Sequence, residues 1–244
     1  MSLSPVAVHT IFEMAAYAVG TQIYLRQRRR LSLPALIDSG HSLMVVVGAA
    51  MGAAIGSKLA FWLDDPLAAF ASFPDWRHLI EGKSIVGGLL GGLIGVEAAK
   101  AVMGIRTSTG DAFVWPLAIG MCVGRIGCFL AGIGDHTYGT ASSLPWAVDF
   151  GDGIPRHPTQ LYEIVFLLCW TAFIWRRRER LSRSGDIFRL YLSGYLLFRL
   201  LVEFIKPVPY AYAGLTGIQW LAIAGLAYDV RHLPRLGREL LSST

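Results

Sequence analysis

The sequence predicts an all-α, polytopic membrane protein, and three observations lead to this fold class. Hydrophobic residues make up 54% of the 244 residues and charged residues only 16%, whereas roughly a quarter of the residues in soluble domains are charged. The mean hydropathy is +0.49. The apolar residues also gather in seven stretches, each close to the ~20 residues that a helix needs to cross hydrocarbon. These features exclude disordered, collagen-like, disulfide-rich and ordinary cytosolic proteins.

The candidate spans follow one another in a single transmembrane domain, residues 1–244. The second and seventh are nearly free of charge, whereas the others contain single ionisable residues, so their assignment depends partly on the flanking segments. The first stretch runs into a cluster of arginines rather than a cleavage site, so we expect it to be retained as a helix. The predicted spans lie near residues 5–24, 40–62, 85–103, 112–131, 158–175, 187–205 and 214–229.

The basic residues of the connections predict the orientation of the helices. One set of alternate segments holds 13 lysines and arginines, and the other set holds four. Because basic loops stay in the cytoplasm, we expect the amino terminus outside and the carboxyl terminus inside. The predicted internal segments are 25–39, 104–111, 176–186 and 230–244, and the predicted external loops are 63–84, 132–157 and 206–213.

Glycine is placed regularly in two of the spans. Small residues four positions apart lie on one helix face and let helix backbones approach closely in lipid. We expect these faces to serve helix packing rather than chemistry. The two runs are Gly48, Gly52 and Gly56, and Gly87, Gly91 and Gly95.

Ionisable side chains inside the spans are the first candidates for function. A charge at the centre of a bilayer costs at least ~2.5 kcal/mol, so residues of this kind generally mark a functional site. For Glu13, Lys58 and Glu97 a purely structural role is the stronger interpretation. The full set is Glu13, Lys58, Glu97, Arg125, Glu163, Arg199 and Glu203.

Three spans place polar groups at one level, in the predicted outer half of the membrane. Arg125 lies about four turns from the inner end of the fourth span. Tyr195, Arg199 and Glu203 lie four positions apart on one face of the sixth span. Further polar residues gather where the fifth span begins, after Pro158, which suits a first helical turn.

Two arginines at this level predict a site for a lipid phosphate. A guanidinium group binds phosphate through a planar fork and keeps its charge in an apolar cleft. The alternative is structural, with Arg199 paired to Glu203 and Arg125 paired to Glu163 or Glu97. The sequence leaves both interpretations open.

Motifs along most of the chain resemble those of the prolipoprotein diacylglyceryl transferases, which are bacterial membrane enzymes. Residues 124–129, GRIGCF, are similar to the family's GRxGNF signature, and residues 156–163, RHPTQLYE, are similar to a second family stretch. Residues 195–204 match the family pattern Y-x-x-F-R-x-x-x-E-F, and residues 219–220, QW, resemble part of the last helix. Each motif alone is weakly specific, but their order and the seven-helix orientation make the set specific.

The resemblance implies transfer of the diacylglyceryl group of phosphatidylglycerol to the lipobox cysteine thiol of a secreted preprotein, with release of glycerol 1-phosphate. The expected location is the external leaflet of the bacterial inner membrane, with loop 132–157 at the mouth of the site. It also implies that Arg125 and Arg199 bind the phosphate and stabilise the leaving group, and that Glu203 orients Arg199. Further residues are expected to line the cleft, namely Gly124, Gly127, Gly139, His157, Gln160, Tyr162 and Tyr195.

The sequence departs from the family pattern in several places, which include the loss of the glutamate expected before Gly139 and a shorter external segment 132–157. The HGG motif appears as VGG at residues 86–88, without its histidine, and Cys128 stands in place of the asparagine of GRxGNF. The catalytic base for an acceptor thiol is therefore open. His136, which Asp135 would orient, is the first candidate, and His157 or water is the alternative. Cys128 as a covalent nucleophile is disfavoured because its own helix offers no adjacent base.

Other functions also place charges inside a membrane. A transporter or a non-enzymatic lipid-binding protein is one alternative, although no inverted repeat is visible, and a transferase with a different acceptor is another. A retinal protein is disfavoured because the last span has no lysine for a Schiff base. The spans contain no His or carboxylate cluster at ligand spacing, so no metal or cofactor is expected. The basic residues flank apolar runs, so we expect no nucleic-acid partner.

Overall fold

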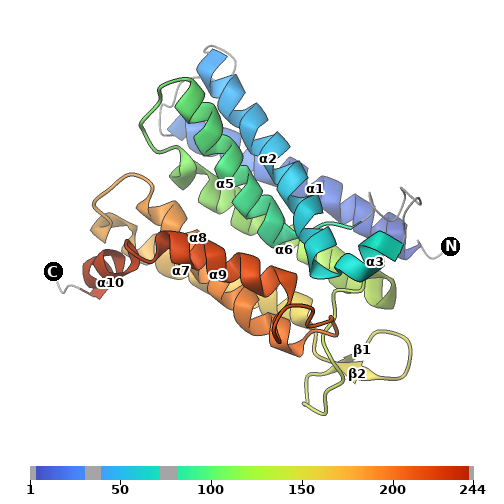
Figure 1. Ribbon diagram of the computed structural model, residues 1–244. Helices are drawn as coiled ribbons and strands as arrows, with labels where there is room; N and C mark the ends of the chain where they lie inside the picture. Colours follow the sequence, from blue (N-terminus) through green and yellow to red (C-terminus); the bar gives the residue numbers. More distant parts are fainter. Residues whose placement is uncertain (1–3, 31–39, 72–81, 242–244) are drawn as a thin grey trace.

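Helices form at all seven of the predicted stretches. The computed structural model describes residues 4–30, 40–71 and 82–241, and parts of the predicted connections 25–39 and 63–84 lie outside these residues. Figure 1 shows a bundle of helices with a short β-hairpin at one end. The seven helices are α1 (Pro5–Arg30), α2 (Gly40–Asp64), α5 (Ile85–Val102), α6 (Val114–Ala131), α7 (Thr159–Arg177), α8 (Asp186–Val202) and α9 (Gly217–Asp229).

Short elements connect or extend these helices in the described part of the chain. The strands β1 (Val148–Asp149) and β2 (Pro155–Arg156) pair antiparallel in the predicted external loop 132–157. The remaining elements are α3 (Pro66–Ala71), α10 (Leu233–Leu241) and the 3₁₀ turns η1 (Gly110–Phe113), η2 (Gly132–Asp135), η3 (Arg178–Arg180) and η4 (Glu203–Ile205).

Among the described residues, three helical segments are long and apolar enough to cross a membrane by length and composition alone. They are Leu43–Asp64, Ile85–Val102 and Gly110–Asp135, with mean hydropathies of 1.8, 1.6 and 1.8. The expected all-α membrane protein is thereby confirmed in outline. The number of seven spans stays a prediction, because α8 and α9, with 17 and 13 residues, are shorter than a full span.

The two glycine runs face each other across the antiparallel α2–α5 contact. A Cβ atom added to Gly52 would lie 2.2 Å from the carbonyl oxygen of Gly91, and one added to Gly56 would lie 2.4 Å from that of Gly87. Gly48 and Gly95 meet in the same way. The expected packing role is therefore confirmed, and the backbones touch at a distance that only glycine permits.

The other helices pair along their lengths, α1 with α6, α6 with α7, α7 with α8, and α8 with α9. The amino terminus lies at the end of the bundle that carries the hairpin, and the carboxyl terminus lies at the opposite end (Figure 1). Fully buried Leu167, Tyr191 and Leu196 belong to the core between these helices.

The start of α9 is fixed by a capping box. The Thr216 hydroxyl accepts from the backbone N–H of Gln219, and the Gln219 side chain accepts from the backbone N–H of Thr216 at 2.9 Å. Gln219 also donates to the carbonyl oxygen of Leu200 at the end of α8. In this structure the QW motif of residues 219–220 therefore holds two helix ends together.

Candidate functional site

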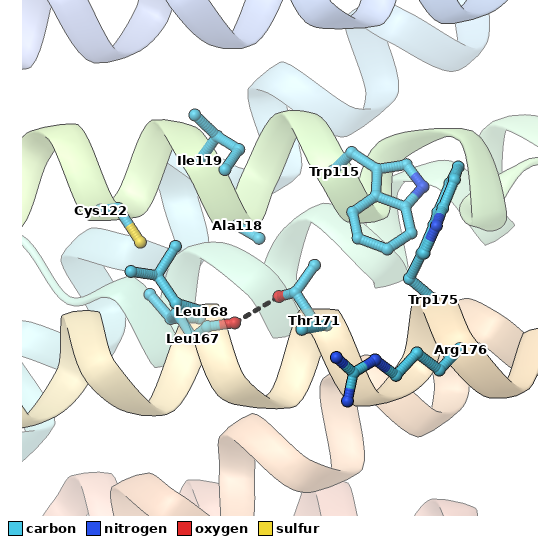
Figure 2. Close-up of a pocket in the computed structure, with 10 residues that line it drawn as sticks. Trp115, Ala118, Ile119, Cys122, Leu167, Leu168, Thr171, Trp175 and Arg176 are labelled. Atoms are coloured by element: carbon cyan, nitrogen blue, oxygen red, sulfur yellow. Dashed lines mark hydrogen bonds between the residues drawn. The ribbon is translucent and has the colours of Figure 1, made fainter.

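An apolar groove of about 280 Å³ runs between α6 and α7 (Figure 2). Trp115 and Trp175 lie at one end, with ring centroids 4.9 Å apart in an edge-to-face contact. Cys122 lies at the other end, one helical turn before Arg125. The lining is mostly aliphatic and aromatic, so it suits an alkyl chain better than a polar molecule.

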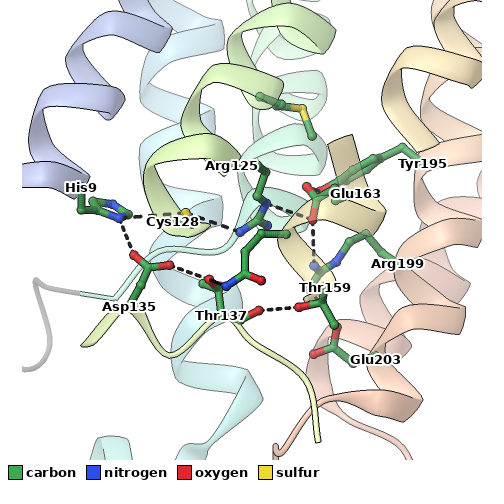
Figure 3. A network of polar contacts seen from close by, with 12 residues as sticks. His9, Arg125, Cys128, Asp135, Thr137, Thr159, Glu163, Tyr195, Arg199 and Glu203 are labelled. Atoms are coloured by element: carbon green, nitrogen blue, oxygen red, sulfur yellow. Dashed lines mark hydrogen bonds and ion pairs between the residues drawn. The ribbon is translucent and has the colours of Figure 1, made fainter. Parts of the chain in front are cut away.

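Glu163 is the centre of the buried polar cluster beyond this groove (Figure 3). Its side chain is 2% exposed, and its Oε2 atom lies 3.0 Å from Nε of Arg125 and 3.4 Å from Nη1 of Arg199. Its Oε1 atom accepts a hydrogen bond of 2.9 Å from the Tyr195 hydroxyl. One carboxylate on α7 thus joins α6 and α8.

Arg199 forms a second ion pair with Glu203, four positions further along the chain. Nη2 of Arg199 donates to Oε2 of Glu203 at 2.8 Å, and both side chains are buried. The i,i+4 spacing predicted this contact. The two arginine pairs of the structural interpretation are therefore present. Of the two partners considered for Arg125, the structure has Glu163 and not Glu97.

Hydrogen-bonding capacity remains in this cluster after the ion pairs are formed. Among the described residues of the cluster, Nε of Arg199, Oε1 of Glu203 and Oε1 of Gln160 are buried and have no hydrogen-bond partner. Buried polar atoms without partners are rare in proteins because each costs free energy. A ligand with its own donors and acceptors would satisfy them, so the two interpretations of the arginines are compatible.

Gln160 ties the cluster to the loop after α6. Its Nε2 atom donates to the Thr137 hydroxyl at 3.0 Å, and the Thr159 hydroxyl donates to the Thr137 carbonyl oxygen. The Thr137 hydroxyl in turn donates to Asp135, so Thr137 lies between Thr159 and Asp135 in Figure 3. The first turn of α7 and the beginning of loop 132–157 are therefore held together.

Lys206 follows η4, just outside the predicted sixth span. Burial, and then the like charge of Arg199, lowers the pKa of this lysine to about 8, and Glu203 opposes the shift. The group therefore loses its charge close to physiological pH. The sequence alone does not indicate a role for Lys206, because a single lysine beside a proline resembles an ordinary loop residue.

The other ionisable residues of the spans have partners outside this cluster. Lys83 forms an ion pair with Glu13, Lys100 pairs with Glu97 at 2.9 Å, and Lys58 donates to the carbonyl oxygen of Gly82. A structural role for Glu13, Lys58 and Glu97 was the expectation, and these contacts agree with it.

Several predicted cleft residues lie beside the cluster and make contacts of their own. Nδ1 of His157 lies 3.1 Å from the Tyr162 hydroxyl, which accepts from the Trp146 indole N–H at 2.8 Å. Gly139 donates its N–H to the carbonyl oxygen of His157, and a Cβ atom there would lie 2.7 Å from the Cβ atom of His157. These residues fold the loop against the start of α7.

The glycines of the GRIGCF motif adjoin α1. A Cβ atom added to Gly127 would lie 2.3 Å from the Cβ atom of Phe12, whereas one added to Gly124 would meet Ala16 at an ordinary 3.9 Å. Gly127 is thus required for close packing of α6 on α1. The arginine between these glycines points to the opposite side, toward Glu163.

The structure does not place Asp135 against His136. Asp135 is in direct contact with His9 of α1 and accepts from the Thr137 hydroxyl. His136 has a φ of 54°, in the left-handed region, and its ring lies 6.3 Å from that of Tyr138. The expectation that Asp135 orients His136 is therefore wrong, because the two oxygens of the Asp135 carboxylate contact His9 and Thr137 instead.

His9 could not be identified as a site residue from the sequence. Nδ1 of His9 contacts Asp135 and lies 4.0 Å from Sγ of Cys128, whose sulfur lies 3.8 Å from Nη1 of Arg125. The only signal in the sequence is a polar residue near the outer end of the first span. Its 119-residue separation from Cys128 hides the contact.

Comparisons with known proteins identify the family of this chain. The prolipoprotein diacylglyceryl transferase family model matches residues 1–231. A phosphatidylglycerol–prolipoprotein diacylglyceryl transferase of Bordetella parapertussis is 32% identical over 91% of this chain and 88% of its own. The Methylococcus capsulatus protein of that name is 34% identical over 91% and 86%, and the Vibrio parahaemolyticus protein is 39% identical over 71% and 61%. This chain therefore belongs to the prolipoprotein diacylglyceryl transferase family.

Proposed function

We propose that the protein is a membrane transferase that moves the diacylglyceryl group of phosphatidylglycerol to the cysteine thiol of a prolipoprotein. The family and its curated relatives support this reaction and these two substrates. The observation that carries the proposal is the pair of buried arginines, Arg125 and Arg199, joined through Glu163 beside donors and acceptors that are left unpaired.

The arginines bind the lipid phosphate through the N–H groups that the carboxylates leave free. Each guanidinium has five N–H donors, so an ion pair with Glu163 or Glu203 leaves capacity for phosphate oxygens. The carboxylates fix the orientation of both guanidinium groups before the lipid binds. Such preorganised charge is worth more in a site that excludes water.

The apolar groove between α6 and α7 holds an acyl chain of the same lipid. It ends one helical turn from Arg125, so a headgroup at the arginines places an alkyl chain along Cys122 and Leu167. The chain gains free energy by burial against this lining. Gln160 and Tyr195 then line the cleft on the headgroup side.

In the reaction the acceptor sulfur attacks the glyceryl carbon that carries the phosphate ester. A C–S bond forms while the C–O bond breaks, and glycerol 1-phosphate leaves with the electron pair of that bond. The thiol proton is released. Arg125 and Arg199 stabilise the charge that grows on the departing phosphate, and Glu203 keeps Arg199 in position.

The spans are seven in number, with the amino terminus outside and the active site toward the external leaflet of the inner membrane. Support comes from a helix at each of the seven predicted stretches, termini at opposite ends of the bundle, and the split of 13 to four basic residues. We expect a reporter after Thr244 to be cytoplasmic and a cysteine near Asp149 to be labelled from outside. Opposite labelling would overturn both the orientation and the level of the site.

The reaction is tested with purified protein, phosphatidylglycerol carrying a labelled acyl group, and a lipobox peptide. We expect label on the peptide and free glycerol 1-phosphate in equal amounts. Growth of a strain depleted of its own diacylglyceryl transferase provides the matching test in cells. Binding of phosphatidylglycerol without transfer to any lipobox peptide would overturn the acceptor and favour a different one.

A further inference from the structure

Three side chains of metal-binding type meet beside Arg125. His9 comes from the second turn of α1, Cys128 from the last turn of α6, and Asp135 from the end of η2 (Figure 3). One donor atom of each lies within 4.8 Å of the other two. No metal site was expected, because no single span contains ligands at the required spacing. The three residues come together only because α1 packs on α6.

The donor atoms converge on one point. Nδ1 of His9 faces both the Asp135 carboxylate, which it contacts directly, and Sγ of Cys128 at 4.0 Å. A nucleophile–histidine–acid relay needs the two ring nitrogens to face different partners. Here the same nitrogen faces both partners, as it does when imidazole, thiolate and carboxylate bind one ion.

A hydroxyl donor orients the Asp135 carboxylate, and a carboxylate lies near the second ring nitrogen of His9, beyond hydrogen-bond distance. Nε2 of His9 lies 4.0 Å from Oε2 of Glu13, and Oδ2 of Asp135 accepts from the Thr137 hydroxyl at 2.5 Å. Lys83 and Tyr17 hold the other oxygen of Glu13. A metal-binding histidine generally donates its second N–H to a carboxylate, and a metal-binding carboxylate is itself hydrogen-bonded.

We propose that His9, Cys128 and Asp135 bind a Zn²⁺ ion and leave one coordination position open. Thiolate and imidazole select zinc over calcium or magnesium, and three protein ligands with a fourth open position are typical of catalytic zinc sites. The Cys128 and Asp135 side chains are buried, whereas the His9 side chain is 39% exposed, so the open position is reached from its side.

The charges near the site are balanced for a divalent cation. The thiolate and the Asp135 carboxylate together carry two negative charges, which match those of the ion. Arg125 lies 3.8 Å from the Cys128 sulfur, and its own charge is paired with Glu163. The metal site and the arginine cluster are thus adjacent. Cys128 and Asp135 balance the charge of the ion, and Glu163 balances that of Arg125.

The role of the ion rests on the proposed function. An acceptor thiol in the open position loses its proton to solvent on binding, because zinc-bound thiols are deprotonated. The resulting thiolate attacks the glyceryl carbon of the lipid held by Arg125, and no oxidant or reductant is needed. Zinc takes the place of a catalytic base, since Val86 stands where the family has a histidine. The thiolate ligand, Cys128, stands where the family has an asparagine.

The metal site is tested by cobalt substitution in purified protein carrying Cys169→Ser, which removes the exposed thiol. We expect one Co²⁺ ion per chain, with the thiolate-to-cobalt charge-transfer band and the visible bands of a four-coordinate site. Cys128→Ser should abolish the charge-transfer band, and His9→Ala, Asp135→Asn and Glu13→Gln should each weaken binding about 10-fold or more. His232→Ala, far from the site, should leave the spectrum unchanged.

The spectrum of the parent protein decides the proposal even if a variant fails to fold. Absence of the charge-transfer band, or the same band in Cys128→Ser, would overturn the site. A second measurement separates this from the proposed reaction. Removal of the ion should stop thiol transfer while phosphatidylglycerol still binds, and zinc should restore it. If transfer to the peptide thiol is equally fast without the ion, the ion does not activate the thiol. If the cobalt band is present but no transfer occurs, the metal site is upheld and the lipobox thiol is not the acceptor.

Discussion

The α2–α5 interface and the polar cluster between α6, α7 and α8 join helices in opposite ways. The first uses backbones in direct contact, with three pairs of glycines facing each other. The second uses long charged side chains that meet around Glu163. In lipid, close packing stabilises helix pairs without chemistry, whereas buried charges are costly and persist where they have a function. The difference indicates which interface supports the fold and which supports the reaction.

The largest effect is expected from Arg125→Lys. Lysine keeps the positive charge but lacks the planar fork that contacts Glu163 and phosphate together. Transfer to a lipobox peptide should fall about 100-fold or more, while the melting temperature changes little. Arg183→Lys, in the exposed segment before α8, is the matched control and should keep full activity. Near-normal turnover of correctly inserted Arg125→Lys would leave this arginine with a structural role only.

Gly91→Ala tests the opposite region, with Gly92→Ala as its neighbouring control. A Cβ atom at Gly91 would lie 2.2 Å from the Gly52 carbonyl oxygen, whereas one at Gly92 would lie 3.5 Å from the Ala49 carbonyl oxygen. The first variant should lose about 1–3 kcal/mol of stability through overpacking, and the second should be neutral or slightly stabilised by the better helix propensity of alanine. Thermal unfolding in detergent measures both. Equal melting temperatures would mean that the glycine faces do not need backbone contact.

The two regions also differ in how far the sequence predicted them. Glycines four positions apart and the pair Arg199–Glu203 follow from helical periodicity alone, so their faces could be assigned in advance. The contact between Arg125 and Glu163 needed two helices to be placed side by side. The contact of His9 with Asp135 could not be predicted, because it joins α1 to the η2 turn, which are far apart in the sequence.

Tyr195→Phe sharpens the comparison within the polar cluster. The Tyr195 hydroxyl donates to Glu163 at 2.9 Å, whereas the hydroxyl of the equally buried Tyr191 donates to the sulfur of Met121 at 3.3 Å. A hydrogen bond to a charged group contributes about 1.5–3 kcal/mol, so we expect Tyr195→Phe to lower turnover roughly 10-fold. Tyr191→Phe should stay within about twofold, since sulfur is a weak acceptor. A similar loss in both variants would indicate a packing effect.

The smallest expected effect concerns Lys206, which lies at the edge of the charged cluster. Its lowered pKa of about 8 means that it is charged below this pH and neutral above it. Arg199 and Arg125 face it with like charge, and Glu203 and Glu163 with opposite charge. Phosphatidylglycerol binding should therefore weaken a few-fold as the pH rises through 8, because a cation beside the phosphate is lost.

Stability should change in the other direction over the same range. A lysine whose folded pKa lies below its unfolded value binds fewer protons in the folded state, so the free energy of unfolding rises from about pH 8 toward the ordinary lysine pKa of 10.5. Lys206→Arg keeps its charge and should abolish both trends, which can be measured by lipid binding in nanodiscs and by thermal unfolding at matched pH. Binding and stability that decline together in the wild type would point to alkaline unfolding instead of the loss of one charge at the phosphate site.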